Sequence, residues 1–252
     1  MKHSGLYLSI AAVTGLGLLT AELLWHGIQD PGCSWFGASV LRGPSEQPAV
    51  YLTFDDGPSE GTEEVLDILD RFKAKATFFQ CGANAERLPN TTSVVHKAGH
   101  TIGNHTYSHR RLCLLPRGPI QQEIIRTQTI LESVSGARPT FFRPPFGLRW
   151  IGLDHAQRNS GLTSVLWSTI GYDWIWDADQ ISEHVLREAT AGSIICLHDG
   201  RRLKPNPDIR STLKALRQII PELIQRGFEL RALSDLPLAD AILNGSERSR
   251  TP

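Results

Sequence analysis

From residue 49 onward, short apolar runs alternate with longer segments of helical pattern, and this alternation is the strongest constraint on the fold. The runs are rich in Val, Ile, Thr, Phe and Leu, which strands favour. They cover seven stretches of the chain: 49–54, 76–81, 100–104, 140–143, 163–168, 193–197 and 228–233. Strands that alternate with helices form parallel sheets, so the sequence predicts an α/β fold, a distorted seven-stranded (β/α) barrel with parallel strands.

Unusual polar residues follow the predicted strands directly. In a (β/α) barrel, the loops after the strands share one rim, and active sites are built there. Five strand ends contribute: Asp55 with Asp56, His105 with His109, Arg143, Asp173 with Trp174, and His198. The sequence therefore predicts a single site at this rim.

Two of these residues suggest a metal ion. His105 and His109 are four positions apart, which places both imidazoles on one side of a helical turn. Alone, such a pair is more often a solvated or core pair. A carboxylate from a neighbouring strand end would complete a two-His, one-carboxylate site that binds zinc or a similar divalent ion and activates water. Of the neighbours Asp55 and Asp56, one would then bind the metal and the other would move protons.

The balance of positive and negative residues limits the kinds of molecule that the chain is expected to bind. Lys and Arg together number 26, as do Asp and Glu, so the formal net charge is zero. This balance gives no electrostatic footprint for nucleic acid and leaves neutral polymers or small molecules as easier partners. Arg201, Arg202 and Lys204 follow His198, and we interpret them as a solvated loop rather than a contact for an anionic polymer.

The cysteines do not indicate a zinc ribbon. None of the four, at positions 33, 81, 113 and 196, belongs to a Cys-x-x-Cys pair. Cys81 and Cys196 lie in strand-like runs, so we expect both to be small buried hydrophobic residues.

The N-terminal segment predicts export. Residues 1–26 contain one Lys before an uncharged apolar stretch that Glu22 interrupts, as in a signal anchor, with a cleaved signal peptide as the alternative. Residues 27–48 read as a linker, 49–235 as the catalytic barrel and 236–252 as a C-terminal tail. Lys2 predicts that the barrel lies outside the cytoplasm, membrane-anchored or, if the segment is cleaved, secreted.

Five motifs follow one another along the chain: TFDDGPS, HTYSH, RPPFG, DW and LHD. In this order they resemble the motifs of the polysaccharide deacetylases, carbohydrate esterase family four. The resemblance covers roughly residues 48–235, and an ordered set is far more specific than any single motif. It implies a distorted barrel of seven β/α units that removes N- or O-acetyl groups from polymers such as chitin, peptidoglycan and xylan.

The resemblance also implies catalytic roles. Asp55 is the general base, Arg143 tethers and orients it, and His198 is the general acid. Asp173 orients either Arg143 or His198. One divalent ion is implied, with zinc expected first and cobalt or another ion as the alternative. Its ligands are Asp56, His105 and His109.

Further residues are implied to contact the substrate. Pro145 and Phe146 form one wall of the groove and Trp174 the other, and the backbone N–H of Phe146 helps to bind the oxyanion. Leu197 is a further predicted substrate-binding residue. Cys196 stands where the family's pocket Leu falls, so the acetyl pocket is expected to differ in shape.

The leading prediction is a metal-dependent deacetylase of an N-acetylated polysaccharide or oligosaccharide, chitin-like or peptidoglycan. An amidase acting on small C–N substrates is one alternative, and a catalytically silent carbohydrate-binding protein is another. Asp55 and His198 argue against the silent protein, because a degenerate member would be expected to lose its base or acid. The sequence leaves the oligomeric state open.

Overall fold

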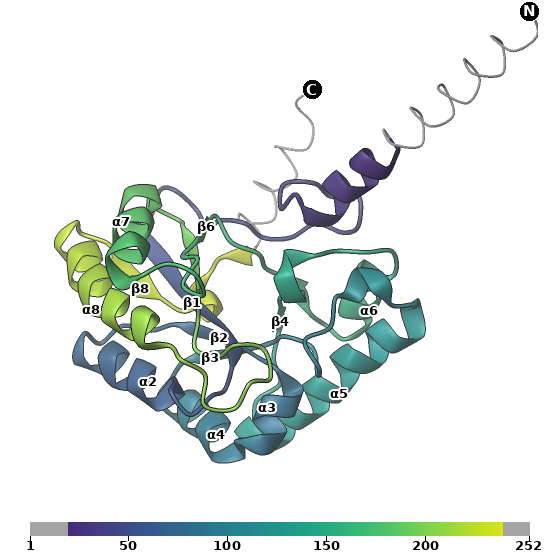
Figure 1. Cartoon of the computed structure of the whole chain (residues 1–252), viewed down its shortest axis with the longest axis horizontal. Helices are drawn as coiled ribbons and strands as arrows, with labels where there is room; N and C mark the ends of the chain where they lie inside the picture. The colour runs from purple at the N-terminus through teal and green to yellow at the C-terminus, as the bar shows by residue number, and fades with distance from the viewer. Residues whose placement is uncertain (1–19, 239–252) are drawn as a thin grey trace, which may run out of the picture.

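The structure is a computed structural model that describes residues 20–238 (Figure 1). The strands are β1 (Ala49–Gly57), β2 (Thr77–Gln80), β3 (Thr101–Asn104), β4 (Phe141–Phe142), β5 (Thr163–Ser164), β6 (Thr169–Ile170), β7 (Ile194–His198) and β8 (Glu229–Arg231). The α-helices after β1 are α2 (Thr62–Arg71), α3 (Gly82–Arg87), α4 (Pro89–Lys97), α5 (Arg117–Ser135), α6 (Leu153–Asn159), α7 (Ala178–Glu188) and α8 (Arg210–Gln225). Short 3₁₀ turns cover Leu112–Leu114, Pro145–Gly147 and Leu233–Asp235.

The strands form one parallel sheet that curls into a half-barrel. Seven of them follow the order β5-β4-β3-β2-β1-β7-β6, and β8 pairs with the start of β1 off this path. The helices surround the outer face of the curled sheet (Figure 1). The predicted α/β fold with parallel strands is therefore confirmed.

The predicted strand over residues 163–168 is wrong in extent. Strand β5 ends at Ser164, and β6 begins at Thr169. Although they are close in sequence, β5 and β6 lie at opposite edges of the sheet path, and they do not pair with each other within the described part of the chain. The chain between them passes from one edge strand of the sheet to the other, and these two edges face each other without pairing along a line that we call the seam. The apolar run 163–168 therefore contributes to both edge strands instead of forming one strand.

Residues 40–43 run along this seam. Val40 N donates to Ser164 O over 2.9 Å, and Leu166 N donates to Val40 O over 2.9 Å. On the other side, Gly43 N donates to Gly192 O over 2.8 Å, just before β7. A segment from the predicted linker therefore supplies hydrogen bonds that a missing strand–strand pair would otherwise provide.

The preceding segment is also held against the barrel. The buried guanidinium of Arg149 donates to the backbone carbonyls of Asp30, Cys33 and Gly37. Residues 20–29 form a helix. Most of the predicted anchor and C-terminal tail lies outside the described residues, and none of the helices within 20–238 has the length and apolarity needed to cross a membrane. The domain boundaries remain predictions.

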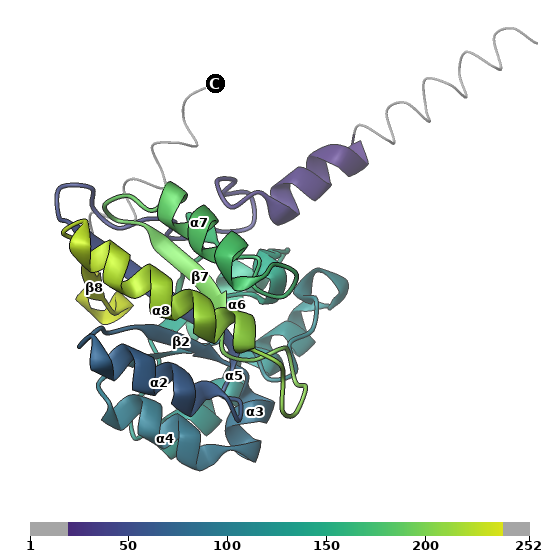
Figure 2. The same ribbon diagram turned by 60° about the vertical axis from the view of Figure 1, so that its left-hand side comes forward.

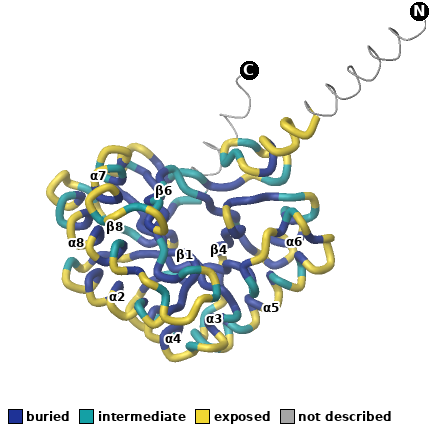
Figure 3. The backbone as a smooth tube through the Cα atoms, viewed as in Figure 1, coloured by how far each residue is buried: buried dark blue, intermediate teal, exposed yellow. Residues whose placement is uncertain are grey.

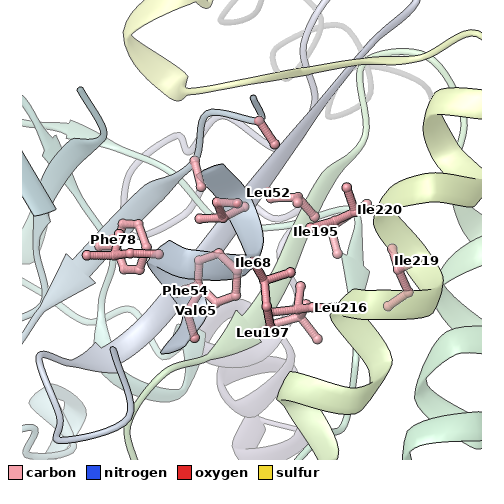
Figure 4. Packing of buried hydrophobic residues seen from close by; sticks show 14 of the residues in the cluster. Leu52, Phe54, Val65, Ile68, Phe78, Ile195, Leu197, Leu216, Ile219 and Ile220 are labelled. Carbon is pink, nitrogen blue, oxygen red and sulfur yellow. The ribbon is translucent and has the colours of Figure 1, made fainter. Parts of the chain in front are cut away.

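One apolar layer lies between the sheet and its helices (Figure 4). It includes Leu52 and Phe54 from β1, Leu197 from β7, and Leu216 and Ile220 from α8. On α8 the buried apolar residues recur at helical spacing, so that one stripe of the helix faces the sheet. Helices α2 and α8 cover neighbouring parts of this layer (Figure 2). The residues of the sheet are mostly buried, whereas exposed residues lie at the periphery of the molecule (Figure 3).

The other face of the strands points into the half-barrel. Tyr51 and Ile194 belong to a second, smaller apolar cluster there, together with Phe79 and Val165. The two faces follow from the alternation of side chains along a strand. Cys81 and Cys196 are fully buried, as predicted.

Candidate active site

The carboxyl ends of the strands surround a cavity of about 450 Å³. It is lined by Asp55, Asp56, His105, His109, Arg111, Phe146, Trp167, Ile170, Trp174, Cys196, His198, Arg201 and Arg202. The structure thus brings together residues that lie up to about 150 positions apart in the sequence, because parallel strands share one carboxyl edge.

The neighbouring acids Asp55 and Asp56 both reach this cavity. Asp55 continues the alternation of β1 and faces the barrel interior. Asp56 has a φ of 72°, and the register with β2 shifts between Asp55 and Gly57. Regular strand geometry would send adjacent side chains to opposite faces, but the left-handed conformation of Asp56 turns its carboxylate into the same site. Such a conformation is uncommon outside glycine and costs energy.

Asp56 lies against two imidazoles. Its Oδ1 is 3.4 Å from His105 Nε2 and 2.8 Å from His109 Nε2, and all three side chains are buried. Within residues 20–238, this oxygen has no hydrogen-bond partner of good geometry. Buried polar atoms normally have one. An unsatisfied carboxylate oxygen facing two ring nitrogens fits a divalent cation, and the three residues form a candidate metal-binding group.

The protonation of this group suits a cation. His105 Nδ1 lies 2.7 Å from Arg143 O, which can only accept, so Nδ1 carries a proton and Nε2 is the nitrogen that faces Asp56. Burial alone would raise the pKa of Asp56, but the adjacent imidazoles of His105 and His109 hold it well below its usual range. Burial lowers the pKa of His109. An ionised carboxylate and neutral imidazoles are the states that bind metals.

Asp55 is held by a buried guanidinium. Arg143 Nη1 donates to Asp55 Oδ1 over 2.6 Å and to Thr53 Oγ1 over 2.8 Å. Its Nε donates to Val165 O over 3.1 Å, and its Nη2 donates to Leu166 O over 2.9 Å. Since the guanidinium is fixed on several sides, it fixes Oδ1 of Asp55, while Oδ2 lies outside this ion pair and has only the Cys196 thiol, at 3.5 Å, as a hydrogen-bond donor within residues 20–238.

Asp173 contacts His198. Its Oδ1 lies 2.7 Å from His198 Nδ1, and its Oδ2 accepts from Thr212 Oγ1 over 2.6 Å. Arg201 Nη1 is 3.7 Å from Oδ2. Burial alone would lower the pKa of His198, but the Asp173 carboxylate raises it to about 9. Among the described residues Asp173 makes no contact with Arg143, so of its two predicted partners the structure gives it His198.

Two exposed aromatic side chains line the cavity. Phe146 is 38% exposed, and its ring lies edge-on to His109 at 4.7 Å between centroids. Trp174 is 46% exposed and lies edge-on to His198 at 5.2 Å. Pro145 is buried beneath Phe146 in the same 3₁₀ turn, so it supports the wall without facing the cavity.

The prediction that Leu197 binds substrate is wrong. Leu197 lies in the apolar layer beneath the helices, and Cys196 lines the cavity instead. His198 faces the cavity, so strand alternation requires residue 196, not 197, to face it too. Cys196 Sγ lies 3.5 Å from Asp55 Oδ2, and burial and the nearby Asp55 charge raise the pKa of the thiol well above its usual value.

Five residues that line the cavity were not predicted as site residues: Arg111, Trp167, Ile170, Arg201 and Arg202. Trp167 lies near the end of the predicted strand 163–168, and this position close to the expected rim was a usable signal. Arg111 follows His109 by two positions, but nothing in the sequence distinguishes it. Arg201 and Arg202 were interpreted as a solvated loop, yet both line the cavity. Their position directly after the predicted acid His198 was the available signal.

Backbone strain collects around the cavity. Six non-glycine residues in or beside its lining have positive φ: Asp56, Thr106, His109, Phe146, Tyr172 and Arg202. Residues in sparsely populated conformations persist only when surrounding contacts hold them, and they cluster at functional sites.

Comparison with known proteins identifies the family to which this parallel half-barrel belongs. Residues 42–165 match the polysaccharide deacetylase family model. A peptidoglycan-N-acetylglucosamine deacetylase of Bacillus cereus is 37% identical over 198 residues, which cover 75% of this chain and 68% of that protein. The chain therefore belongs to the polysaccharide deacetylase family.

Two further relatives agree. A chitooligosaccharide deacetylase of Sinorhizobium fredii is 35% identical, and the match covers 77% of this chain and 94% of that protein. The crystal structure of a peptidoglycan N-acetylglucosamine deacetylase superposes with a TM-score of 0.73 at 36% identity, covering 78% of this chain and 91% of that one.

Proposed function

We propose that this protein is a hydrolase that uses one divalent metal ion to remove acetyl groups from an N-acetylated glycan of the peptidoglycan or chitin type. The names of its relatives support this substrate class. The observation that carries the proposal is the separation of the two neighbouring acids. Asp55 is bound by Arg143, whereas Asp56 faces His105 and His109.

We assign the metal to Asp56, His105 and His109. Two imidazoles and one carboxylate suit zinc, and cobalt(II) accepts the same donors. A divalent ion held there would supply Lewis acidity toward the acetyl carbonyl and would make water at the site more acidic.

Asp55 acts as the base. Its Oδ1 is held by Arg143, so Oδ2 takes the proton from the attacking water as the water oxygen bonds to the carbonyl carbon. The carbonyl oxygen becomes an oxyanion, toward which the backbone N–H of Phe146 donates. One such donor is worth about 3 kcal/mol in the transition state.

His198 acts as the acid. Its Nδ1–H donates to Asp173, which orients the ring and leaves the Nε2 proton for the departing nitrogen. With its pKa raised to about 9 by Asp173, His198 is protonated at neutral pH. When the C–N bond breaks, the nitrogen leaves as an amine with the His198 proton, and acetate is the other product. Trp174 and Phe146 hold the sugar between them.

Acetate release tests the proposal. Chitin oligomers, peptidoglycan and acetylxylan are each incubated with zinc-loaded, cobalt-loaded and metal-stripped protein. We expect acetate from an N-acetylated glycan, loss of turnover on stripping, and recovery on adding metal. Metal binding without turnover would instead indicate the silent carbohydrate-binding protein. Turnover confined to small amides would indicate the amidase.

We place the reaction outside the cytoplasm, where peptidoglycan lies. The predicted signal anchor or signal peptide in residues 1–26 would deliver the barrel there. Protease treatment of intact cells checks this placement: digestion of the barrel without lysis supports it, and protection until lysis contradicts it.

A further inference from the structure

Two arginines border the same stretch of the cavity rim. The guanidinium carbon of Arg111, which precedes the 3₁₀ turn after β3, lies 5.2 Å from the centre of the Phe146 ring. That of Arg202, which follows β7, lies 5.1 Å from the same ring centre. Both residues are exposed and both line the cavity. They come from different loops, and each contacts the Phe146 ring, in the wall that we assign to the substrate.

Neither guanidinium forms a hydrogen bond or an ion pair within residues 20–238. Within the described chain, Arg111 and Arg202 have no carboxylate or hydrogen-bond acceptor for their side chains. Their neighbour Arg201 differs, because it donates to the backbone oxygens of Asp173 and Gly200. The contacts with Phe146 are weak at an exposed site, and they leave the N–H donors available. The pair therefore offers unsatisfied donors to whatever occupies the rim.

The backbone of Arg202 is fixed in an unfavourable conformation. Its φ is 53°. Its N–H donates to Asp56 Oδ2 over 2.6 Å, and its carbonyl accepts from Asn84 Nδ2 over 2.8 Å. Because these bonds hold the main chain, the side chain starts from a defined point beside the candidate metal centre. A solvated loop would not require such support.

The charge around the cavity is uneven although the chain is neutral. The two carboxylates that line it, Asp55 and Asp56, are buried and face Arg143 and the two imidazoles. The exposed part of the lining carries Arg111 and Arg202. An incoming ligand therefore meets positive charge at the rim before it reaches the buried acids.

We propose that Arg111 and Arg202 bind a carboxylate of the glycan beside the acetamido group that enters the cavity. This inference rests on the proposed deacetylase function and narrows its substrate class to acidic N-acetylated glycans. Guanidinium groups match carboxylates in geometry and charge. The carboxylate can belong to a lactyl ether on the sugar or to a peptide attached to the glycan. Neutral chitin oligomers offer neither group.

A matched set of substrates tests the inference. An N-acetylated, peptide-free glycan fragment with free lactyl carboxylates is compared with the same fragment after its carboxylates are converted to amides. A fragment that keeps its peptides, free or amidated, forms the second pair. We expect the acidic member of at least one pair to have a kcat/KM about tenfold higher, the size of one charge-assisted hydrogen bond. The pair that shows the preference identifies which carboxylate is bound.

Variants then assign the preference to the two arginines. In Arg111→Gln/Arg202→Gln the ratio of acidic to amidated kcat/KM should fall to about one through a higher KM for the acidic substrate. Lys at both positions should restore part of the ratio, because charge is kept while the planar donors are lost. Arg138→Gln is the control. Arg138 lies in the loop before β4, at the amino ends of the strands and away from the carboxyl rim, so this variant should keep the ratio.

Salt provides a measurement that needs no variant. The preference of the unmodified protein should weaken as NaCl rises from low to near-molar concentration, because exposed charges are screened. Equal kcat/KM for both members of both pairs would overturn the inference while leaving deacetylation intact. Equal loss on acidic and amidated substrates in the Gln double variant would also overturn it, since that indicates a structural role. Acetate release from none of the substrates would instead overturn the proposed function.

Discussion

The two faces of strands β1 and β7 differ in chemistry although the same short segments supply both. Toward the helices they carry Leu52, Phe54, Ile195 and Leu197, all fully buried among apolar side chains. Toward the interior they carry polar or ionisable groups near the rim, Thr53 and Asp55 on β1 and Cys196 and His198 on β7. Because successive side chains on a strand point to opposite faces, the same few residues supply both the apolar core on the helix side and the cavity-lining groups on the interior side.

The two regions also differ in backbone conformation. The helix-facing layer is built on regular strands and helices. The rim holds most of the non-glycine residues with positive φ, including Asp56 and His109. Substitutions on the helix-facing side should therefore change the free energy of unfolding, whereas substitutions on the interior side should change turnover or metal content.

The largest expected effect comes from the acid pair. Asp55→Asn keeps the size of the side chain and removes the base, so kcat should fall roughly 100- to 10,000-fold while bound metal stays stoichiometric. Asp56→Asn should lower metal content as well as turnover. Elemental analysis alongside acetate release separates the two. Equal metal loss in both variants would contradict the assigned roles.

The next effect compares adjacent residues on β7. Leu197→Ala removes a fully buried side chain beneath the helices, so the free energy of unfolding should fall by about 2–5 kcal/mol. Cys196→Ala removes a smaller group from the cavity floor and should change kcat/KM more than stability. Urea unfolding and steady-state kinetics on both proteins check this. The comparison of faces fails if Leu197→Ala alters kcat/KM at full folding while Cys196→Ala only destabilises.

A smaller effect concerns pH. Asp173 raises the pKa of His198 from 6.5 to about 9, so the pair contributes its full stability below about pH 6.5 and loses it as the pH rises through 9. The acid is active when protonated, so the alkaline limb of kcat/KM should lie near pH 9 as an apparent value of the coupled site. In Asp173→Asn this limb should move toward pH 6.5. An unmoved limb would show that another group sets it.

The smallest effect is expected at the start of α7, which is not part of the cavity lining. Asp177 begins α7 by accepting a hydrogen bond from Gln180 N, and the Gln180 side chain bonds back to Asp177 N. Asp177→Ala should cost about 1 kcal/mol of stability and leave kcat unchanged. Thermal unfolding and acetate release measure the two. A change in kcat would mean that the rim depends on this helix start.

The sequence predicted the parallel α/β fold because strand and helix patterns alternate without interruption. It also predicted which strand ends meet, since parallel strands share one carboxyl edge. It did not predict the seam between β5 and β6, because the apolar run 163–168 has the composition of one continuous strand. Hydrogen bonding with residues 40–43, more than 120 positions away, decides its division.

Two details of the site were also beyond the sequence. The local sequence around Asp56 does not require its φ of 72°. Contacts with residues distant in the sequence hold this conformation, such as the hydrogen bond from Arg202 N to Asp56 Oδ2. The error at Leu197 has a different origin. Residues two positions apart on a strand share a face, so Cys196 faces the cavity together with His198, and Leu197 between them faces the helices. The prediction placed Leu197 on the wrong face of β7, and this two-residue period would have corrected it.

The seam formed by Val40 affects how this protein can be produced. A recombinant fragment that begins at residue 49, where the first predicted strand starts, would lack the hydrogen bonds from Val40 to Ser164 and Leu166. It would leave an uncovered strand edge, the kind of surface on which chains pair with one another and aggregate. A fragment that begins before residue 30 retains both the seam and the backbone carbonyls that Arg149 holds. The apparent linker is therefore part of what keeps neighbouring molecules apart.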